Sequence, residues 1–257
     1  MGLFSKDALL EIAKGNVPGH TVIEKFGRND AVPNGSWADI QTIGGSVFWH
    51  TTADTLNAVS TSANDTAAGS GARVITIQGL DANFDVQEED LALSGVTPVT
   101  SANSYIRVHR VFVKDTGTYG GLLTGGNAGN ISFTKTTGGN AIGEILIDNS
   151  APIGQTQLAR YTIPNAKTAY LFAVDVNVEV NKPARVVMWQ RQGADVVAAP
   201  FTSKRMVLEF DGLQQPDDLQ MRVPLMFPGK TDLWFSAEGG GAATQVNVRF
   251  LLILVDD

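Results

Sequence analysis

Side chains able to carry out acid–base or metal chemistry are few in this sequence, and their spacing does not suit a site. His20, His50 and His109 show neither the HxH nor the HxxxH spacing that brings two imidazoles to one metal ion. The adjacent carboxylates Glu88 and Glu89 would point to opposite faces of a strand, so they cannot easily act as a catalytic pair. EF-hand loops and the G-x-S-x-G nucleophile turn are absent as well. We therefore expect no enzyme, no catalytic or metal-binding residue and no cofactor.

Aromatic and glycine-rich stretches are the remaining candidates for binding. Tryptophans can form a platform for sugar rings, although in a β protein of this size they lie more often in the core or at its rim. The chain has Trp37, Trp49, Trp189 and Trp234. The segment 116–130 holds six glycines, but it has neither the GK[ST] ending nor the following helix of a phosphate-binding loop. We expect a long exposed loop there, in which Tyr119, Leu122 and Leu123 contact another surface.

Composition and charge exclude several classes of protein. Of 257 residues, 43% are hydrophobic, 18% are charged and 27 are glycine, which is typical of a turn-rich globular protein. A net charge of −7 argues against direct binding to nucleic acid, and we interpret the basic stretches 107–110 and 204–205 as solvated strand faces. The absence of cysteine excludes disulfides and thiolate sites, and it fits a reducing cytoplasm. No apolar stretch reaches the roughly 18–20 residues that cross a bilayer and no signal peptide is recognisable, so we expect no membrane association.

The N-terminal segment 1–45 is expected to hold a helix followed by an extended anchoring arm. Residues 5–14 are the best helix candidate, because Ser5 can cap a helix and Asp7 suits its first turn. Residues 17–29 show no clear period, and two alternatives stay open for them. They either pack on their own domain or form an arm that becomes ordered against a neighbouring subunit. The candidate anchor residues of the segment are Leu9, Leu10, Ile12, Val22, Ile23 and Phe26.

Residues 46–257 are typical of a β-sandwich domain. Short strands follow one another without helical patterns between them. Residues 172–179 alternate apolar and polar side chains, which indicates one buried and one solvated face, whereas residues 246–254 are nearly all apolar, as in a central strand. We expect an all-β fold, a jelly-roll-like β-sandwich with a short N-terminal helix and extended arm. A turn cluster at 149–152 is a candidate subdivision, so one elaborated sandwich and two packed sandwiches are both open.

Five stretches carry a family resemblance. The longest, STSANDTAAGSGARVITIQGLDANFDVQEEDLALSGVTPVTSANSYIRVHRVFV, spans residues 60–113. The others are IAKGNVPGHTVIEKFGRN (12–29), GGNAGNISFT (125–134), GQTQLARYTIPNAKTAYL (154–171) and FLLILVDD (250–257). Together they resemble virion structural proteins of tailed bacteriophages, many of them from marine and environmental phages. The resemblance touches most of the chain, carries no known catalytic residue and does not fix a position in the virion.

The resemblance implies a structural component of a phage particle that is assembled in the cytoplasm of the bacterial host. Our first hypothesis is a capsid decoration or cement protein, a homo-oligomer such as a trimer that stabilises the shell by contacting the major capsid protein. The arm, the glycine-rich loop and the free sheet edges would supply these contacts. A tail, neck or fibre-base component is the first alternative. A module that binds carbohydrate of the host is the second, and a groove lined by tryptophan would favour it.

Overall fold

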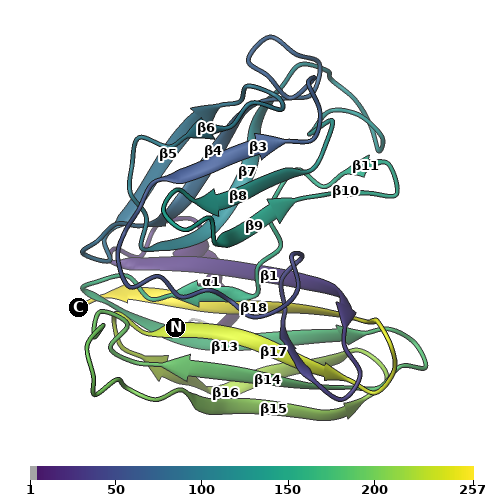
Figure 1. Ribbon diagram of the computed structural model, residues 1–257. Coiled ribbons are helices and arrows are strands. Elements are labelled where there is room, and N and C mark those ends of the chain that lie inside the picture. The colour runs from purple at the N-terminus through teal and green to yellow at the C-terminus, as the bar shows by residue number, and fades with distance from the viewer. Residues whose placement is uncertain (1–4) are drawn as a thin grey trace.

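The protein folds almost entirely into antiparallel β-sheet, as the sequence predicts (Figure 1). The computed structural model describes residues 5–257, with side chains from Ala8 onward. This part of the chain has one helix, α1 (Ser5–Ala13), and eighteen strands, β1 to β18. The strands form two stacked units, which we call the base (β1, β2 and β12–β18) and the upper unit (β3–β11). The all-β expectation is confirmed.

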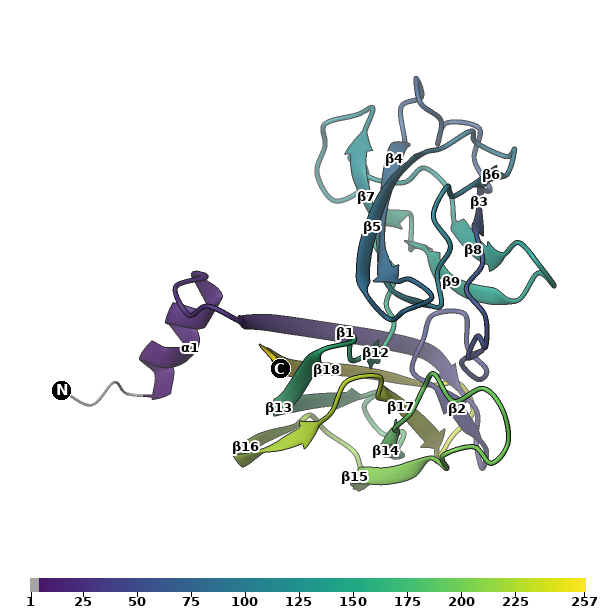
Figure 2. The same cartoon turned by 90° about the vertical axis from the view of Figure 1, so that its left-hand side faces the viewer.

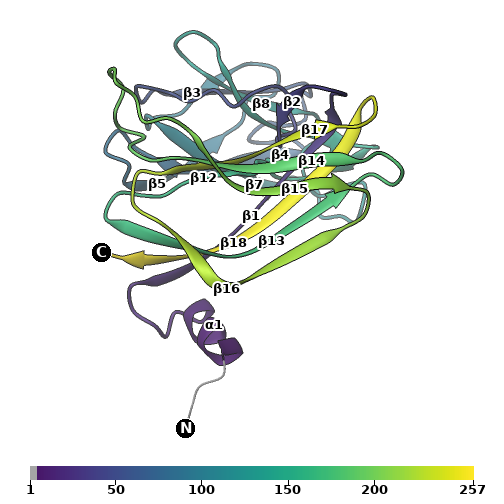
Figure 3. The same ribbon diagram turned by 90° about the horizontal axis from the view of Figure 1, so that it is seen from below.

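The base consists of two sheets that enclose one hydrophobic core. The first sheet has the order β1 (His20–Val32), β18 (Thr244–Asp256), β13 (Lys167–Val178), β16 (Asp217–Phe227). The second has the order β12 (Arg160–Thr162), β17 (Asp232–Gly239), β14 (Ala184–Arg191), β15 (Arg205–Leu213). Every second residue of a strand points into the core, as Val174 and Val176 do from the first sheet and Phe235 does from the second. The two sheets overlap when seen from below (Figure 3).

One edge position of the second sheet is shared by two short strands that are far apart in the sequence. β2 (Trp37–Asp39) pairs with residues 236–238 of β17, and β12 pairs with residues 232–234. Both run antiparallel to β17, so they lie end to end along the same edge. The upper unit is therefore an insertion between the two halves of a single edge strand (Figure 2).

The inserted upper unit has a core of its own, which includes Leu56, Ile75, Tyr105 and Phe133. One of its sheets has the order β6 (Val99–Thr100), β3 (Leu56–Ser60), β8 (Ile131–Lys135), β9 (Ala141–Ile145). The other has the order β5 (Val86–Ala92), β4 (Ala72–Leu80), β7 (Arg107–Thr116). A small hairpin, β10 (Ile147–Asp148) and β11 (Ala151–Pro152), completes the unit and contains the turn cluster 149–152. After this hairpin the chain returns to the base.

Residues 20–45 are part of the base, which decides between the two alternatives for the N-terminal arm. β1 pairs with β18 along most of its length, and Ile23 packs against the core of the base. Val22 and Phe26 lie in the same strand and are half-buried. The segment from His20 onward therefore packs on its own chain instead of extending to a neighbour.

The predicted N-terminal helix is present and stands clear of both units (Figure 2). α1 ends where Gly15 adopts a φ of 75°, a left-handed conformation that glycine accepts without strain. Leu10 is 52% exposed, and Leu9 and Ile12 are half-buried. Three of the six anchor candidates thus lie on a short projecting helix and three in a strand of the base. No helix of the described chain is long and apolar enough to cross a membrane.

Candidate functional site

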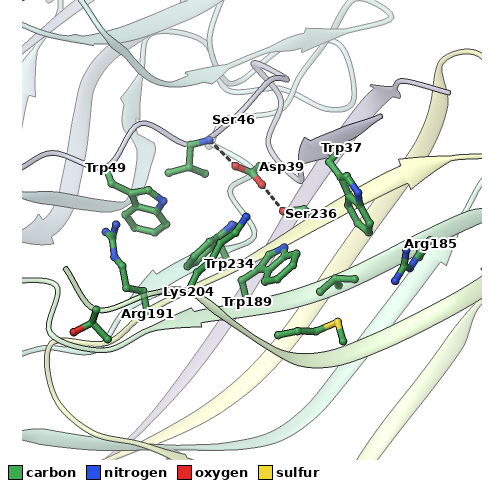
Figure 4. A pocket seen from close by; sticks show the side chains of 14 residues that line it. Trp37, Asp39, Ser46, Trp49, Arg185, Trp189, Arg191, Lys204, Trp234 and Ser236 are labelled. Atoms are coloured by element: carbon green, nitrogen blue, oxygen red, sulfur yellow. Dashed lines mark hydrogen bonds between the residues drawn. The ribbon is translucent and has the colours of Figure 1, made fainter. Parts of the chain in front are cut away.

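A groove of about 660 Å³ on the outer face of the second base sheet brings all four tryptophans of the chain together (Figure 4). Its floor follows from the pairing of the strands, because residues opposite each other on neighbouring strands share a face. Trp189 of β14 lies opposite Trp234 of β17 on one side and Met206 of β15 on the other. One row further along the sheet, Ser236 lies opposite Asp39 of β2.

The segment that leads from the base to the upper unit forms one wall of this groove. Asp39 fixes it, because its carboxylate accepts a hydrogen bond from the backbone N–H of Val47 at 2.6 Å and another from the Ser236 hydroxyl at 2.5 Å. Trp49 of this segment meets Trp234 edge to face, with ring centroids 5.2 Å apart. Trp37 and Trp189 meet in the same way at 6.5 Å (Figure 4). The rings of Trp37, Trp49 and Trp189 stay partly exposed to the groove, whereas Trp234 is buried beneath its neighbours.

Three cations lie beside these tryptophan rings. The Lys204 ammonium is 4.4 Å from the Trp189 ring centroid, and the guanidinium of Arg185 is 5.3 Å from that of Trp37. Arg185 also pairs with Glu209 at 2.5 Å, whereas Lys204 makes no ion pair within residues 8–257. The guanidinium of Arg191, the third cation, lies 5.5 Å from the ring centroid of Trp49. Asp39 is the acidic residue of the lining, so a chain of net charge −7 has here a groove with more cations than anions.

A buried ionic network lies behind the groove and joins the two units. Asp232 of β17 is fully buried and accepts two hydrogen bonds from Arg107 of the upper unit, at 2.9 and 3.0 Å. Thr162 and Arg191 donate to the same carboxylate at 2.7 and 2.6 Å. The Arg107 guanidinium also lies 5.0 Å from the ring centroid of Trp49. The network therefore holds one wall of the groove as well as the contact between the units.

The interpretation of residues 107–110 as a solvated strand face is wrong. Arg107 and His109 are both buried, because the face of β7 that turns away from the upper core packs on the base. The ammonium of Lys25 in β1 donates to the backbone carbonyl of His109. Burial foremost, and then neighbouring cations, place the pKa of Lys25 and that of His109 well below their ordinary values. The interface between the units thus contains a polar layer, which lies beside a small apolar cluster of Leu80, Phe84 and Ile106 with Ala194 of the base.

Two buried histidines make the stability of the protein depend on pH. Burial, with a contribution from nearby cations, lowers the pKa of His50 to about 4, and the pKa of His109 is lowered by the same causes. The unfolded chain takes up protons at these sites below its ordinary pKa of about 6.5, whereas the folded chain does not. Each of the two histidines should therefore leave the stability unchanged above pH 6.5 and lower it as the pH falls from 6.5 to 4.5, by up to about 2–3 kcal/mol per histidine, as urea unfolding would show.

The variant His50→Phe tests this assignment. Neither ring nitrogen of His50 has a hydrogen-bond partner, and the ring meets Phe48 edge to face at 5.1 Å, so an apolar ring suits the site. The variant should match the parent protein at pH 7 and lose less stability on acidification. Carboxylates contribute equally to the two proteins, so the difference between their slopes reports on His50. An unchanged slope between pH 6.5 and 4.5 would contradict the role of His50.

The structure brings together some of the residues that the sequence singled out and separates others. Tyr119, Leu122 and Leu123 are exposed on the loop between β7 and β8 of the upper unit and do not line the groove, and their role as contact residues stays a prediction. Within the described residues no three or more His, Asp or Glu side chains converge as metal ligands would. Of the four tryptophans, which the sequence places in the core or at its rim, Trp234 is buried, Trp49 and Trp189 are half-buried and Trp37 is exposed. The sequence does hold a signal for Trp189. Val187, Trp189 and Arg191 alternate with the core residues of β14, which places all three on the outer face of the sheet.

No family model and no curated protein matches the chain. Among solved structures, the structure of infectious bursal disease virus Gt strain is similar at a TM-score of 0.24 and 9% identity, over 96% of this chain and 78% of that chain. The structure of the Gx strain of the same virus is similar at a TM-score of 0.26 and 8% identity, over 92% and 72%. TM-scores this low do not indicate a shared fold.

Proposed function

We propose that the protein is a structural component of a phage particle, built on a jelly-roll base, and that it acts through contacts between subunits. The strand order supports the jelly roll. If the base strands are numbered along the chain, with β2 and β12 counted as one, the two sheets read 1-8-3-6 and 2-7-4-5. This is the order that two Greek keys produce when they are wound into a jelly roll, an architecture found in viral capsid and lectin domains. Because one fold serves many functions, the role must come from the surfaces.

The observation that carries the proposal is the projecting helix α1. It has only nine residues, and helices shorter than about 12 residues are marginally stable in water without a surface to pack on. Leu10 is exposed, and Leu9 and Ile12 are only partly covered by the same chain. The turn of residues 15–19, with glycines at both ends, joins this helix to β1. A second subunit or the shell would complete the burial of the helix, as an anchor requires.

Open sheet edges offer further contact surface. β16 and β15 are the edge strands on one side of the base, and Val223, Met226 and Met206 expose apolar side chains there. Free backbone groups on such edges can pair with a neighbouring subunit. We propose a decoration or cement role on the capsid, with the major capsid protein and copies of this chain as partners. A tail, neck or fibre-base position is the alternative.

Removal of residues 1–16 should leave the fold intact and abolish incorporation into particles. The cut must precede His20, because β1 is a strand of the base and its loss would expose β18. We expect the melting temperature to move by no more than about 2–4 °C, which corresponds to a loss near 1 kcal/mol. The point variant Leu10→Gln should reduce incorporation, whereas Ala13→Gln, its matched control on the same helix, should not. Normal incorporation of the truncated chain would overturn the anchoring role.

Copy number separates the two positions in the virion. Quantitative mass spectrometry of purified particles, with the major capsid protein as reference, would give this number directly. Hundreds of copies are expected for a decoration protein, and a few to a few tens for a tail or neck component. Absence from the particles would contradict the structural role itself.

A further inference from the structure

We propose that the four-tryptophan groove is a binding site for an acidic oligosaccharide, a chain of pyranose rings that carries carboxylate groups. This inference goes beyond a role in assembly and does not depend on it, because the groove lies on a face of the isolated chain. The ligand class follows from the aromatic residues, the charges and the rigidity of the site.

The aromatic lining requires a ligand with flat apolar faces. Trp37 is 40% exposed, and Trp49 and Trp189 are half-buried. A cluster of partly exposed large aromatic side chains in a concave surface marks a binding site more often than chance exposure. The axial C–H groups of a pyranose ring form such an apolar face, and they pack against the π-face of an indole ring. In Figure 4 the four rings follow one another along the groove, and the three that are partly exposed, Trp49, Trp189 and Trp37, would contact successive rings of a saccharide chain.

The polar lining supplies what the hydroxyl and carboxylate groups of such a ligand need. The carboxylate of Asp39 and the hydroxyls of Ser46, Thr202 and Ser236 border the groove. The Lys204 ammonium is exposed, carries no ion pair within the described chain and lies over Trp189. A carboxylate on a sugar ring placed beside Trp189 would therefore meet an available cation.

The same charges disfavour nucleic acid as the ligand. A single strand needs a positive track that follows its phosphates, together with exposed bases to stack. Here the guanidinium groups of Arg185 and Arg191 are already paired with Glu209 and Asp232, which leaves Lys204 as the available cation of the lining. A saccharide can bind mainly through its rings and place a single carboxylate against Lys204, whereas a nucleic-acid strand depends on a row of cations along its phosphates.

The site is organised before any ligand binds. Its floor consists of paired strands, Asp39 is held by Val47 and Ser236, and Arg191 is held by buried Asp232. Binding of a ligand would therefore cost little conformational entropy of the protein. The volume of about 660 Å³ lies within the range of about 300–1,000 Å³ typical of small-molecule sites.

Intrinsic fluorescence tests the proposal directly, because every tryptophan of the chain lines the groove. The purified full chain would be titrated with oligogalacturonate, oligoalginate and hyaluronan fragments, and with neutral cello- and malto-oligosaccharides. We expect saturable changes in fluorescence with at least one acidic oligosaccharide and weaker or no change with the neutral ones. Isothermal titration calorimetry would supply the stoichiometry, expected to be one site per chain.

Two matched variants identify the contact. Lys204→Met should weaken binding of the acidic oligosaccharide about tenfold or more, because a charge-assisted hydrogen bond is lost. Arg205→Met removes a charge from the next residue, which is exposed but does not line the groove, and should leave the affinity unchanged. Trp37→Ala, at the exposed end of the groove, should also weaken binding while the melting temperature stays close to that of the parent.

Several outcomes would overturn the proposal. Equal losses in Lys204→Met and Arg205→Met would show non-specific attraction to charge. Saturable binding of a thymidine oligonucleotide, or of a peptide with the sequence of residues 1–19, in the absence of saccharide binding would assign the groove to nucleic acid or to contact between subunits. No response to any acidic oligosaccharide at millimolar concentration would contradict the site. None of these results bears on incorporation into particles, so the two proposals fail separately.

Discussion

Replacing Asp232 with alanine should destabilise the protein by about 3–5 kcal/mol, because it leaves a buried guanidinium without its partner. Arg107 and Asp232 are both buried and share two hydrogen bonds. Thr162 would lose an acceptor as well. The substitution should also weaken the contact between the two units, since this pair connects β7 of the upper unit to β17 of the base. Urea unfolding monitored by far-UV circular dichroism would measure the loss.

Arg191→Ala is the matched control for this prediction. Arg191 binds the same carboxylate, but its side chain is 29% exposed, so its removal should cost about 1 kcal/mol or less. The double variant Arg107→Ala/Asp232→Ala should be more stable than the sum of the two single losses predicts, because neither charge is then left alone. Additive losses, or a cost of less than 1 kcal/mol for Asp232→Ala, would contradict a buried pair that holds the units together.

The sequence predicts those parts of the fold that depend on local periodicity. The helix α1, the alternation along β13 and the central position of β18 follow from patterns within 9 to 13 residues. The insertion of the upper unit is not readable in this way. It depends on β2 and β12, two strands of three residues each, which are too short for a periodic signal and are aligned only by their common partner β17.

The polar contact between the units explains two other differences from expectation. A strand with alternating polar residues normally has one solvated face, but β7 has the base on that face, so Arg107 and His109 are buried. β1 shows no clear period because its buried positions include Lys25, Gly27 and Asn29. Lys25 and Asn29 donate to backbone carbonyls, and a side chain at position 27 would collide with the backbone of Ala159. Where one unit packs on another, a polar side chain in the sequence therefore does not indicate a solvent-exposed position.

The sequence likewise predicts only part of the candidate site. Each tryptophan occupies an outward position of its own strand or segment, which the alternation of β14 indicates for Trp189. Their convergence depends on which strands are neighbours, and that order is set by the winding of the whole base. A sequence can therefore suggest that tryptophans could form a platform, as this one does, without showing that they meet.

The second large effect is expected at Asp65, whose carboxylate is fully buried in the upper unit. It accepts hydrogen bonds from the Ser60 hydroxyl at 2.6 Å and from the backbone N–H groups of Ala72, Ala128 and Gly129 at 2.7, 2.7 and 2.9 Å. These four bonds tie three segments of the unit together. Asp65→Ala would leave buried donors without an acceptor, at about 1–3 kcal/mol each, so the loss should exceed about 4 kcal/mol.

A control and a choice of probe make the Asp65 experiment informative about the whole molecule. Asp81 also accepts two backbone hydrogen bonds, but at a half-exposed turn, so Asp81→Ala should cost about 1 kcal/mol or less. All tryptophans report on the groove of the base, whereas circular dichroism reports on both units. Each unit has its own core, so the upper unit of Asp65→Ala can unfold while the base is still folded. The circular dichroism signal should therefore begin to change at a lower urea concentration than the fluorescence signal. Coincident transitions with a large loss would instead mean that the buried ionic network makes the two units unfold as one.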